Sequence, residues 1–286
     1  MDPDQRREGG PLAHPDEPIF HQGLAFDLET LLDRRGLLRV MGIGGLGLAL
    51  GACSTTSGSG ASSTTAASSS SAATSEETWA TIPEETAGPY PGDGSNGPDV
   101  LSQSGIVRRD IRSSFGDLSG TADGVPLAIE VSLEDSASCS PLAGAAVYVW
   151  HCDRDGRYSL YTVTDQNYLR GVQAADDAGK VRFTSVFPAC YSGRWPHIHF
   201  EVYPDLASAT DDANKIATSP IALPKDLCDV VYATSGYEQS VTNLGQVTLA
   251  SDNVFGDDGG VHQLGTVTGS LAGGYSVALT VPVTAG

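Results

Sequence analysis

The stretch from Pro188 to Tyr203, PACYSGRWPHIHFEVY, carries two histidines at alternate positions in a run of aromatic and β-branched residues. Such residues are enriched in strands, so the stretch predicts a β-strand from about His197. Successive side chains of a strand point to opposite faces, and His197 and His199 therefore project from the same side. Two imidazoles on one face have the spacing of metal ligands.

Two tyrosines narrow the choice of metal. Imidazole binds zinc, copper, nickel or iron, so the histidines alone do not select one. A phenol has a pKa of about 10, and a hard, strongly Lewis-acidic cation such as Fe(III) is the usual reason for a protein to hold it as phenolate. One tyrosine precedes the histidines, and another lies in the segment DGRYS at residues 155–159. The sequence thus predicts a ferric site, Fe(3+), with the ligands Tyr158, Tyr191, His197 and His199.

Several other segments alternate in the manner of strands. The expected strands are residues 125–133, 145–152 and 180–186, then the strand from His197 and a closing hairpin in residues 262–270 and 273–283. A short helix is expected at 226–234, and residues 203–220 are expected to form a loop. Many short strands separated by turn signals indicate an all-β fold, an antiparallel β-sandwich with long loops and at most short helices.

A predicted turn at residues 153–156 places Tyr158 just beyond the end of a strand. Loops held by a rigid sheet are where catalytic groups are usually presented. His151 precedes this turn inside the strand, and we interpret it as a buried, hydrogen-bonded histidine rather than as a further ligand.

The composition limits both partners and domain organisation. A formal net charge of -19 at pH 7 excludes nucleic acid as the natural partner, because phosphate contacts require Lys and Arg. The 286 residues divide into a signal segment at 1–52, a flexible linker rich in Ser, Thr, Pro and Gly at 53–104, and one folded domain at 105–286.

The N-terminal segment is typical of a targeting signal. Twin arginines, Arg34 and Arg35, precede a Gly-rich apolar run at residues 40–50 that is short for a membrane span. This pattern resembles a Tat export signal, and the residues up to Cys53 resemble a bacterial lipobox. We therefore expect export through Tat, with a lipid anchor on the outer face of the cytoplasmic membrane, or secretion. The alternative is a cytosolic acidic extension with a chance pair of arginines.

Four further cysteines follow the lipobox: Cys139, Cys152, Cys190 and Cys228. Four cysteines in an exported domain suggest two disulfides, whose connectivity the sequence does not decide. A zinc site is the rival explanation, but no C-x-x-C pair occurs.

Two segments carry a resemblance to a known family. They are PLAGAAVYVWHCDRDGRYS, residues 141–159, and LRGVQAADDAGKVRFTSVFPACYSGRWPHIHFEVY, residues 169–203. Both resemble the intradiol ring-cleavage dioxygenases of the catechol and protocatechuate type, most specifically at G-R-Y-S and at R-x-x-H-x-H from Arg194 to His199. The resemblance implies a non-haem Fe(III) oxidoreductase that incorporates both atoms of O2. Such an enzyme cleaves a catechol-type ring between the two hydroxylated carbons and yields a muconate-type diacid.

The same resemblance implies a role for each site residue. Tyr158 stays bound as a phenolate, whereas Tyr191 leaves when the aromatic diol arrives and takes a substrate proton. His197 and His199 are the remaining ligands, equatorial and axial. Arg194 matches the family arginine that stabilises negative charge on the activated substrate, as a fixed cation does best in a dry site.

The chain also departs from the family pattern. In T-S-P-I-A-L, Pro220 stands where a polar residue typically follows the iron-binding strand. The N-terminal helical segment through which typical members dimerise is replaced by a serine tract and a Pro/Gly stretch, so the oligomeric state is not predicted. An alternative of another class is a cell-surface β-sandwich binding module with a structural metal site, closed to exchange. A copper or zinc enzyme is opposed by the two tyrosines.

Overall fold

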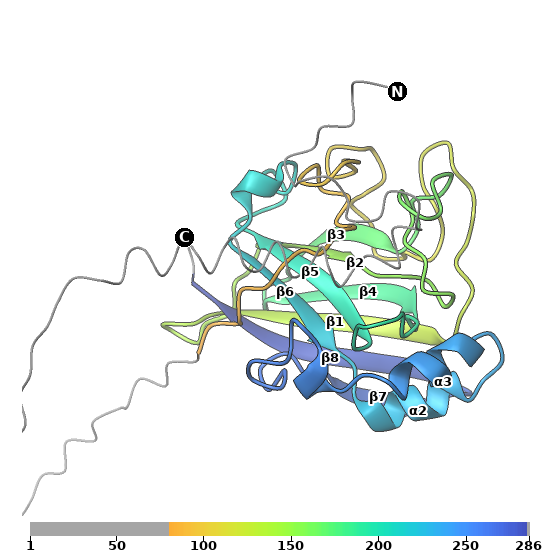
Figure 1. Ribbon diagram of the computed structural model, residues 1–286. Coiled ribbons are helices and arrows are strands. Elements are labelled where there is room, and N and C mark those ends of the chain that lie inside the picture. Colours follow the sequence, from red (N-terminus) through yellow and green to blue (C-terminus); the bar gives the residue numbers. More distant parts are fainter. Residues whose placement is uncertain (1–79, 285–286) are drawn as a thin grey trace, which may run out of the picture.

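The computed structural model describes residues 80–284, and within them the strands form two four-stranded sheets that lie face to face (Figure 1). Their order is β4-β1-β8-β7 in the first sheet and β3-β2-β5-β6 in the second. The strands are β1 (Pro126–Asp135), β2 (Ala146–Trp150), β3 (Arg170–Ala174), β4 (Lys180–Val186), β5 (His197–Tyr203), β6 (Ala217–Ala222), β7 (Thr266–Ser270) and β8 (Gly274–Val283). The predicted all-β sandwich is confirmed.

One strand pair departs from the antiparallel arrangement. β1 and β8 run parallel, with Ile129 opposite Val277, whereas the other neighbouring strands pair antiparallel. Since β1 and β8 lie far apart in the sequence, no tight turn joins them and none imposes the antiparallel direction.

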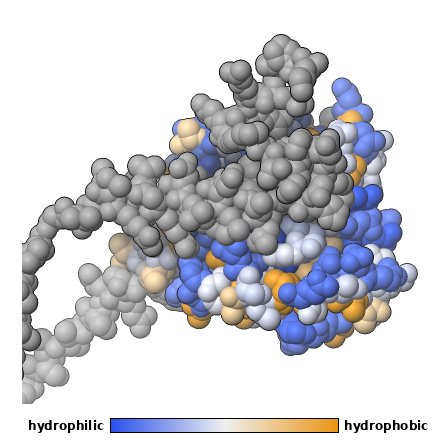
Figure 2. Space-filling model, viewed as in Figure 1, coloured by the Kyte–Doolittle hydropathy of each residue, from blue (hydrophilic) through white to orange (hydrophobic). Residues whose placement is uncertain are grey.

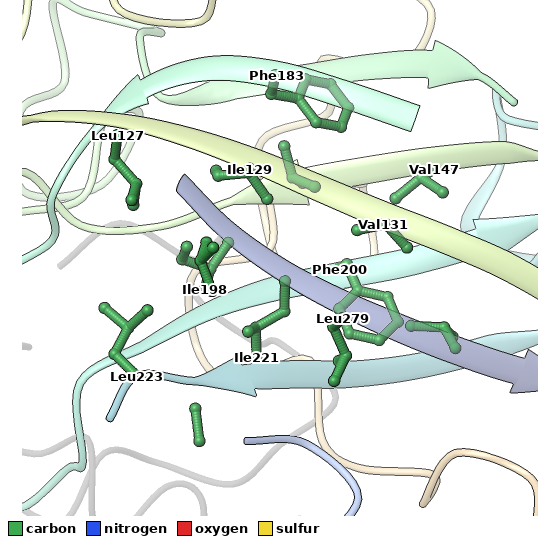
Figure 3. Packing of buried hydrophobic residues seen from close by; sticks show 14 of the residues in the cluster. Leu127, Ile129, Val131, Val147, Phe183, Ile198, Phe200, Ile221, Leu223 and Leu279 are labelled. Carbon is green, nitrogen blue, oxygen red and sulfur yellow. The ribbon is translucent and has the colours of Figure 1, made fainter. Parts of the chain in front are cut away.

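Alternating apolar side chains fill the space between the sheets. Leu127, Ile129 and Val131 of β1 pack in one buried cluster with Ile198 and Phe200 of β5 (Figure 3). Full burial of an aliphatic or aromatic side chain of this size contributes about 1.5–3 kcal/mol. This core holds β5 firmly and leaves its other face available for polar side chains.

That other face of the second sheet is also closed to water. Every residue of β2 and β5 is buried, although their side chains alternate between the two faces. The covering comes from residues 90–106 and from the loop after β2, which join the outer face in a second buried cluster. Its members include Tyr90, Val100, Leu101, Ile106, Tyr148, Trp150, Tyr158 and Tyr203.

Short helices follow β6. They are α2 (Lys225–Tyr232) and α3 (Glu238–Leu244), followed by a single 3-10 turn, η3 (Leu249–Ser251); another such turn, η2 (Asp212–Asn214), precedes β6. Tyr232 Oη donates to Pro188 O over 3.1 Å, and Tyr237 Oη donates to Phe187 O over 2.8 Å. These bonds fix the start of the segment that leads from β4 to the histidine strand.

Most predicted elements are present with ends shifted by one or two residues, β7 begins four residues later than predicted, and three segments differ. Residues 217–222 form β6, so the expectation of a loop reaching residue 220 is wrong at its end. β6 is the edge strand of its sheet, where a proline such as Pro220 is tolerated. β3 and α3 were not predicted, because each is short and neither has a strong periodic pattern.

The expected pair of disulfides is not formed. Cys152, Cys190 and Cys228 are buried thiols, which leaves too few cysteines for two bridges within the domain. Burial raises the pKa of Cys190 to about 12 and that of the other two well above the ordinary value. These side chains therefore behave as small apolar residues of the core, a common use of cysteine.

The N-terminal expectations fall mainly on residues outside the described part. The signal segment at 1–52 and Cys53 lie there, whereas residues 80–104 of the expected linker pack on the domain and bury Ile82 and Val100. No helix within residues 80–284 combines the length and hydropathy needed to span a bilayer. On the face seen in Figure 2, the part that is not covered by grey atoms carries mainly hydrophilic residues with small apolar patches between them.

Candidate metal centre

Two imidazoles meet on the outer face of the second sheet. His197 and His199 of β5 are 3 % and 2 % exposed, and their Nε2 atoms are 3.0 Å apart. Both lie on one face of the strand, as the alternation predicts, and that face carries the second buried cluster. The strand thus presents two nitrogen donors to the same point.

Both imidazoles are neutral in these surroundings. Burial lowers the pKa of each, and the positive charge of Arg194 lowers it further. His197 Nδ1 donates to the carbonyl oxygen of Trp195, because a carbonyl only accepts, and its Nε2 therefore keeps a lone pair. A neutral imidazole with an available nitrogen lone pair is the form that binds metals.

Tyr191 reaches the same point from the segment between β4 and β5. Its Oη lies 3.3 Å from His197 Nε2. The backbone just before it is held by α3, since Cys190 N donates to Ser240 Oγ over 3.0 Å and Cys190 O accepts from Asn243 Nδ2 over 2.8 Å. The short helix that sequence reasoning missed therefore positions one of the candidate ligands.

Tyr158 approaches from the loop after β2. Its side chain is 2 % exposed, and its Oη has no hydrogen-bond partner among residues 80–284. The ring centroid lies 5.9 Å from that of Tyr191 and 4.7 Å from that of Tyr90. Burial raises the pKa of Tyr158 well above its ordinary value, and Tyr191 beside it adds to the effect. A buried hydroxyl without a partner costs about 1–3 kcal/mol, a cost that a bound cation would remove.

Three of these donor atoms, those of Tyr191, His197 and His199, have separations that suit a single metal ion. Two ligand atoms about 2.1 Å from one ion and at right angles to each other lie about 3 Å apart. The separations of 3.0 Å between the histidine nitrogens and 3.3 Å from His197 to Tyr191 match that value. Among residues 80–284, no group of three or more His, Cys, Asp and Glu side chains could hold a metal, so an ion here needs the tyrosines. Because burial opposes phenolate formation, a strongly Lewis-acidic ion such as Fe(III) suits this set.

Arg194 supplies a buried positive charge next to the imidazoles. Its Nε donates to Asp252 Oδ2 over 3.0 Å, and the same oxygen accepts from Trp195 N over 2.6 Å. Asp252 Oδ1 in turn accepts from Val254 N over 2.8 Å. Sequence reasoning missed Asp252, because nothing in the chain links it to an arginine 58 residues away.

A second missed residue, Arg170, ties the covering segments to the sheet. It is 1 % exposed and donates to the carbonyl oxygens of Tyr90, Pro91 and Ser159. It also donates to Ser159 Oγ and to Tyr148 Oη, each over 3.0 Å. Since Ser159 follows the candidate ligand Tyr158, one guanidinium connects the covering residues 90–106 to the loop that carries that tyrosine.

Two further neighbours of the histidines are apolar. Pro220 lies directly opposite His199 in the register of β5 and β6, and it offers no side-chain donor there. Phe255 is fully buried, with its ring centroid 6.4 Å from that of His197. These side chains exclude water from the candidate site.

His151 stays apart from the candidate ligands' hydrogen bonds, as the sequence predicts. It is 2 % exposed, its Nδ1 donates to Cys152 O over 2.7 Å, and its Nε2 lies 2.6 Å from Ser185 Oγ. With both ring nitrogens hydrogen-bonded, it is a satisfied buried histidine.

Comparisons with known proteins point to one family. Residues 96–206, which include all four candidate ligands and Arg194, match the family model described as dioxygenase. A catechol 1,2-dioxygenase from Pseudomonas sp. (strain EST1001) is 36 % identical over 70 residues, 24 % of this chain and 23 % of that enzyme. A chlorocatechol 1,2-dioxygenase from Rhodococcus opacus is 36 % identical over 62 residues, 21 % of this chain and 24 % of that enzyme.

The fold is also shared with a solved structure. An intradiol ring-cleavage dioxygenase from Tetranychus urticae aligns with a TM-score of 0.51 at 24 % identity, over 64 % of this chain and 89 % of that one. The chain spans about a quarter of the length of the curated relatives it matches. The comparisons therefore show that residues 96–206 match a dioxygenase family model and that part of the chain is similar to two catechol-type dioxygenases.

Proposed function

We propose that this protein is a non-haem Fe(III) dioxygenase that cleaves catechol-type aromatic rings between the two hydroxylated carbons. The two atoms of O2 enter the product, a muconate-type diacid, so that the diol and O2 combine without a further reductant. The observation that carries the proposal is the convergence of the His197 and His199 nitrogens, 3.0 Å apart, with the Tyr191 oxygen at 3.3 Å.

The ion would be held by Tyr158, Tyr191, His197 and His199. When bound, Fe(III) would draw electron density from the diol and so open its ring carbon to O2. The chain's own residues would do the rest of the chemistry. The partly exposed Tyr191 would accept a proton from a substrate hydroxyl at Oη, while the fully buried Tyr158 keeps its place. Arg194, fixed by Asp252, would stabilise negative charge on the ring.

The exclusion of water from the candidate site supports the same proposal. Phe255 and Pro220 border the histidines. The second buried cluster, which includes Trp150, covers the outer face of the sheet around them. A fixed positive charge acts more strongly where water is excluded, because the local dielectric is low. The polar donor missing at Pro220 predicts slower turnover than a site that has one.

Oxygen consumption tests this function directly. The full chain loaded with Fe(III) is mixed with catechol, protocatechuate, hydroxyquinol or caffeoyl compounds, and uptake of labelled O2 is followed together with the mass of the product. We expect one O2 consumed per diol and both labelled atoms in the diacid. Tyr158→Phe should lose most activity, whereas Tyr275→Phe in β8 of the other sheet should not. Ferric protein that binds iron but consumes no O2 with any of these diols would contradict the proposal.

We also propose export through Tat and lipid attachment at Cys53. Arg34 and Arg35 ahead of a weakly apolar run support the first, and the lipobox-like residues up to Cys53 support the second. Replacing both arginines with lysine should retain the protein in the cytoplasm, and Cys53→Ser should abolish incorporation of labelled fatty acid. Unchanged export and labelling in these variants would contradict the assignment.

A further inference from the structure

The indole ring of Trp150 lies flat against the imidazole of His199. Their centroids are 4.9 Å apart, and the ring planes differ by 2°. The two residues are opposite each other in the register of β2 and β5, so the stack is a direct cross-strand pair. This contact restricts rotation of the imidazole about its own χ2 angle.

The two candidate histidine ligands are fixed in different ways. His197 donates its Nδ1 hydrogen to Trp195 O, the usual arrangement for a metal-binding histidine. The Nδ1 of His199 is buried and has no hydrogen-bond partner in the described part of the chain. His199 therefore lacks the contact that normally sets the orientation of such a ring, and the indole of Trp150 stacks on its face instead.

Trp150 is itself held rigidly. It is fully buried, and its ring also stacks on that of Tyr148, with centroids 5.0 Å apart and planes at 22°. Tyr148 Oη donates to Pro91 O over 2.7 Å and accepts from Arg170. The indole Nε1 has no hydrogen-bond partner among residues 80–284, so the flat ring surface, and not the N–H group, is what this side chain contributes.

We propose that Trp150 is a positioning residue, whose stacking aims His199 Nε2 at the point shared with His197 Nε2. This rests on the proposed function, in which both nitrogens bind the ferric ion. Stacking here replaces the hydrogen bond that orients the other histidine. Loss of a contact that orients a metal ligand typically weakens metal binding about 10- to 100-fold.

The test separates ring orientation from the filling of space. Trp150→Phe keeps a flat ring, Trp150→Met keeps much of the volume without one, and Phe200→Leu is the matched control. Phe200 is the next residue after His199, is equally buried and points to the opposite face, into the core between the sheets. Fe(III) affinity is measured by competition with a chelator, and the energy of the visible tyrosinate band is recorded for each folded variant.

We expect Trp150→Met to bind Fe(III) about 10- to 100-fold more weakly, with a shifted band. The Fe(III) affinity of Trp150→Phe should stay within about threefold of that of the unmutated chain. Phe200→Leu should lower the stability of the fold but leave the Fe(III) affinity unchanged. Affinity unchanged in Trp150→Met, or reduced equally by Phe200→Leu, would overturn the inference. Failure of the unmutated chain to bind Fe(III) would instead contradict the proposed function.

One measurement needs neither substitution nor metal. Ring-carbon NMR relaxation in the unmutated, metal-free protein compares the order of the two imidazoles. The inference requires the ring of His199 to be as rigid as that of His197, whose hydrogen bond to Trp195 fixes it. Fast reorientation of the His199 ring would overturn the role of Trp150 even where a variant fails to fold.

Discussion

Arg194 and Asp252 form an ion pair that is closed to water. The Nε to Oδ2 distance is 3.0 Å, and the side chains are 1 % and 0 % exposed. Burial alone would raise the pKa of Asp252, but the guanidinium and the backbone donors lower it below the ordinary value. The carboxylate therefore stays charged and holds the arginine beside the histidines.

Removing the carboxylate leaves the guanidinium charged and buried. Asp252→Ala should lower the free energy of unfolding by about 3–5 kcal/mol, and Asp252→Asn, which keeps an acceptor, should lower it less. Urea denaturation measures both. Asp229→Ala is the control, because its pair with Lys225 is exposed and contributes about 1 kcal/mol or less. Equal losses at the two aspartates would contradict the role of the buried pair.

Arg170 should be irreplaceable by lysine. Its five contacts require the planar fork of the guanidinium, and an ammonium cannot reach the oxygens of Tyr90 and Ser159 at once. Arg170→Lys should cost about 2–4 kcal/mol of stability. Hydrogen exchange should then rise in residues 90–106 and 158–168 before it rises in β1. Arg182→Lys, at an exposed surface pair, should change neither measurement, and a matching loss there would contradict the prediction.

His151 should make the domain sensitive to acid. Burial lowers its pKa from 6.5 to about 4, so the unfolded chain binds a proton between these values while the folded chain does not. Stability is therefore full above pH 6.5 and falls as the pH drops towards 4, with a slope of about 1.4 kcal/mol per pH unit for this one group.

Urea unfolding of the metal-free protein between pH 4 and 7 measures that slope. His151→Gln should remove the contribution of one histidine to this slope, while the contributions of the other buried histidines remain. His262→Gln is the control, because that side chain is exposed and stays in water in both states. An unchanged slope in His151→Gln would show that the histidine is not buried in its neutral form.

The parts of the fold and of the candidate site that depend on local sequence patterns were predictable. The alternation of His197 and His199 within strand-forming residues specifies a shared face, because β structure has a side-chain period of two. The sandwich followed from strand lengths and turn signals, since these are local properties. Even the burial of His151 followed from its place in the predicted apolar strand at 145–152, although β2 itself ends one residue earlier, at Trp150.

Long-range relations were not predictable. Asp252 meets Arg194 and Arg170 meets Pro91 through tertiary packing alone, and no periodicity in the sequence encodes either contact. β6 was hidden because Pro220 argues against a strand unless the strand is known to lie at an edge. The disulfide expectation failed for a related reason: the count of cysteines does not reveal whether their side chains point at one another or into the core.

The most direct test of the central claim is the visible spectrum of the protein loaded with Fe(III). If the four side chains share one ferric ion, the protein should be wine-red, with a tyrosinate-to-iron absorption band that shifts on addition of catechol. Tyr158→Phe and Tyr191→Phe should each weaken the band, the double variant should lose it, and Tyr275→Phe should leave it unchanged. Stoichiometric Fe(III) binding without such a band, or a band that survives in the double variant, would contradict the account.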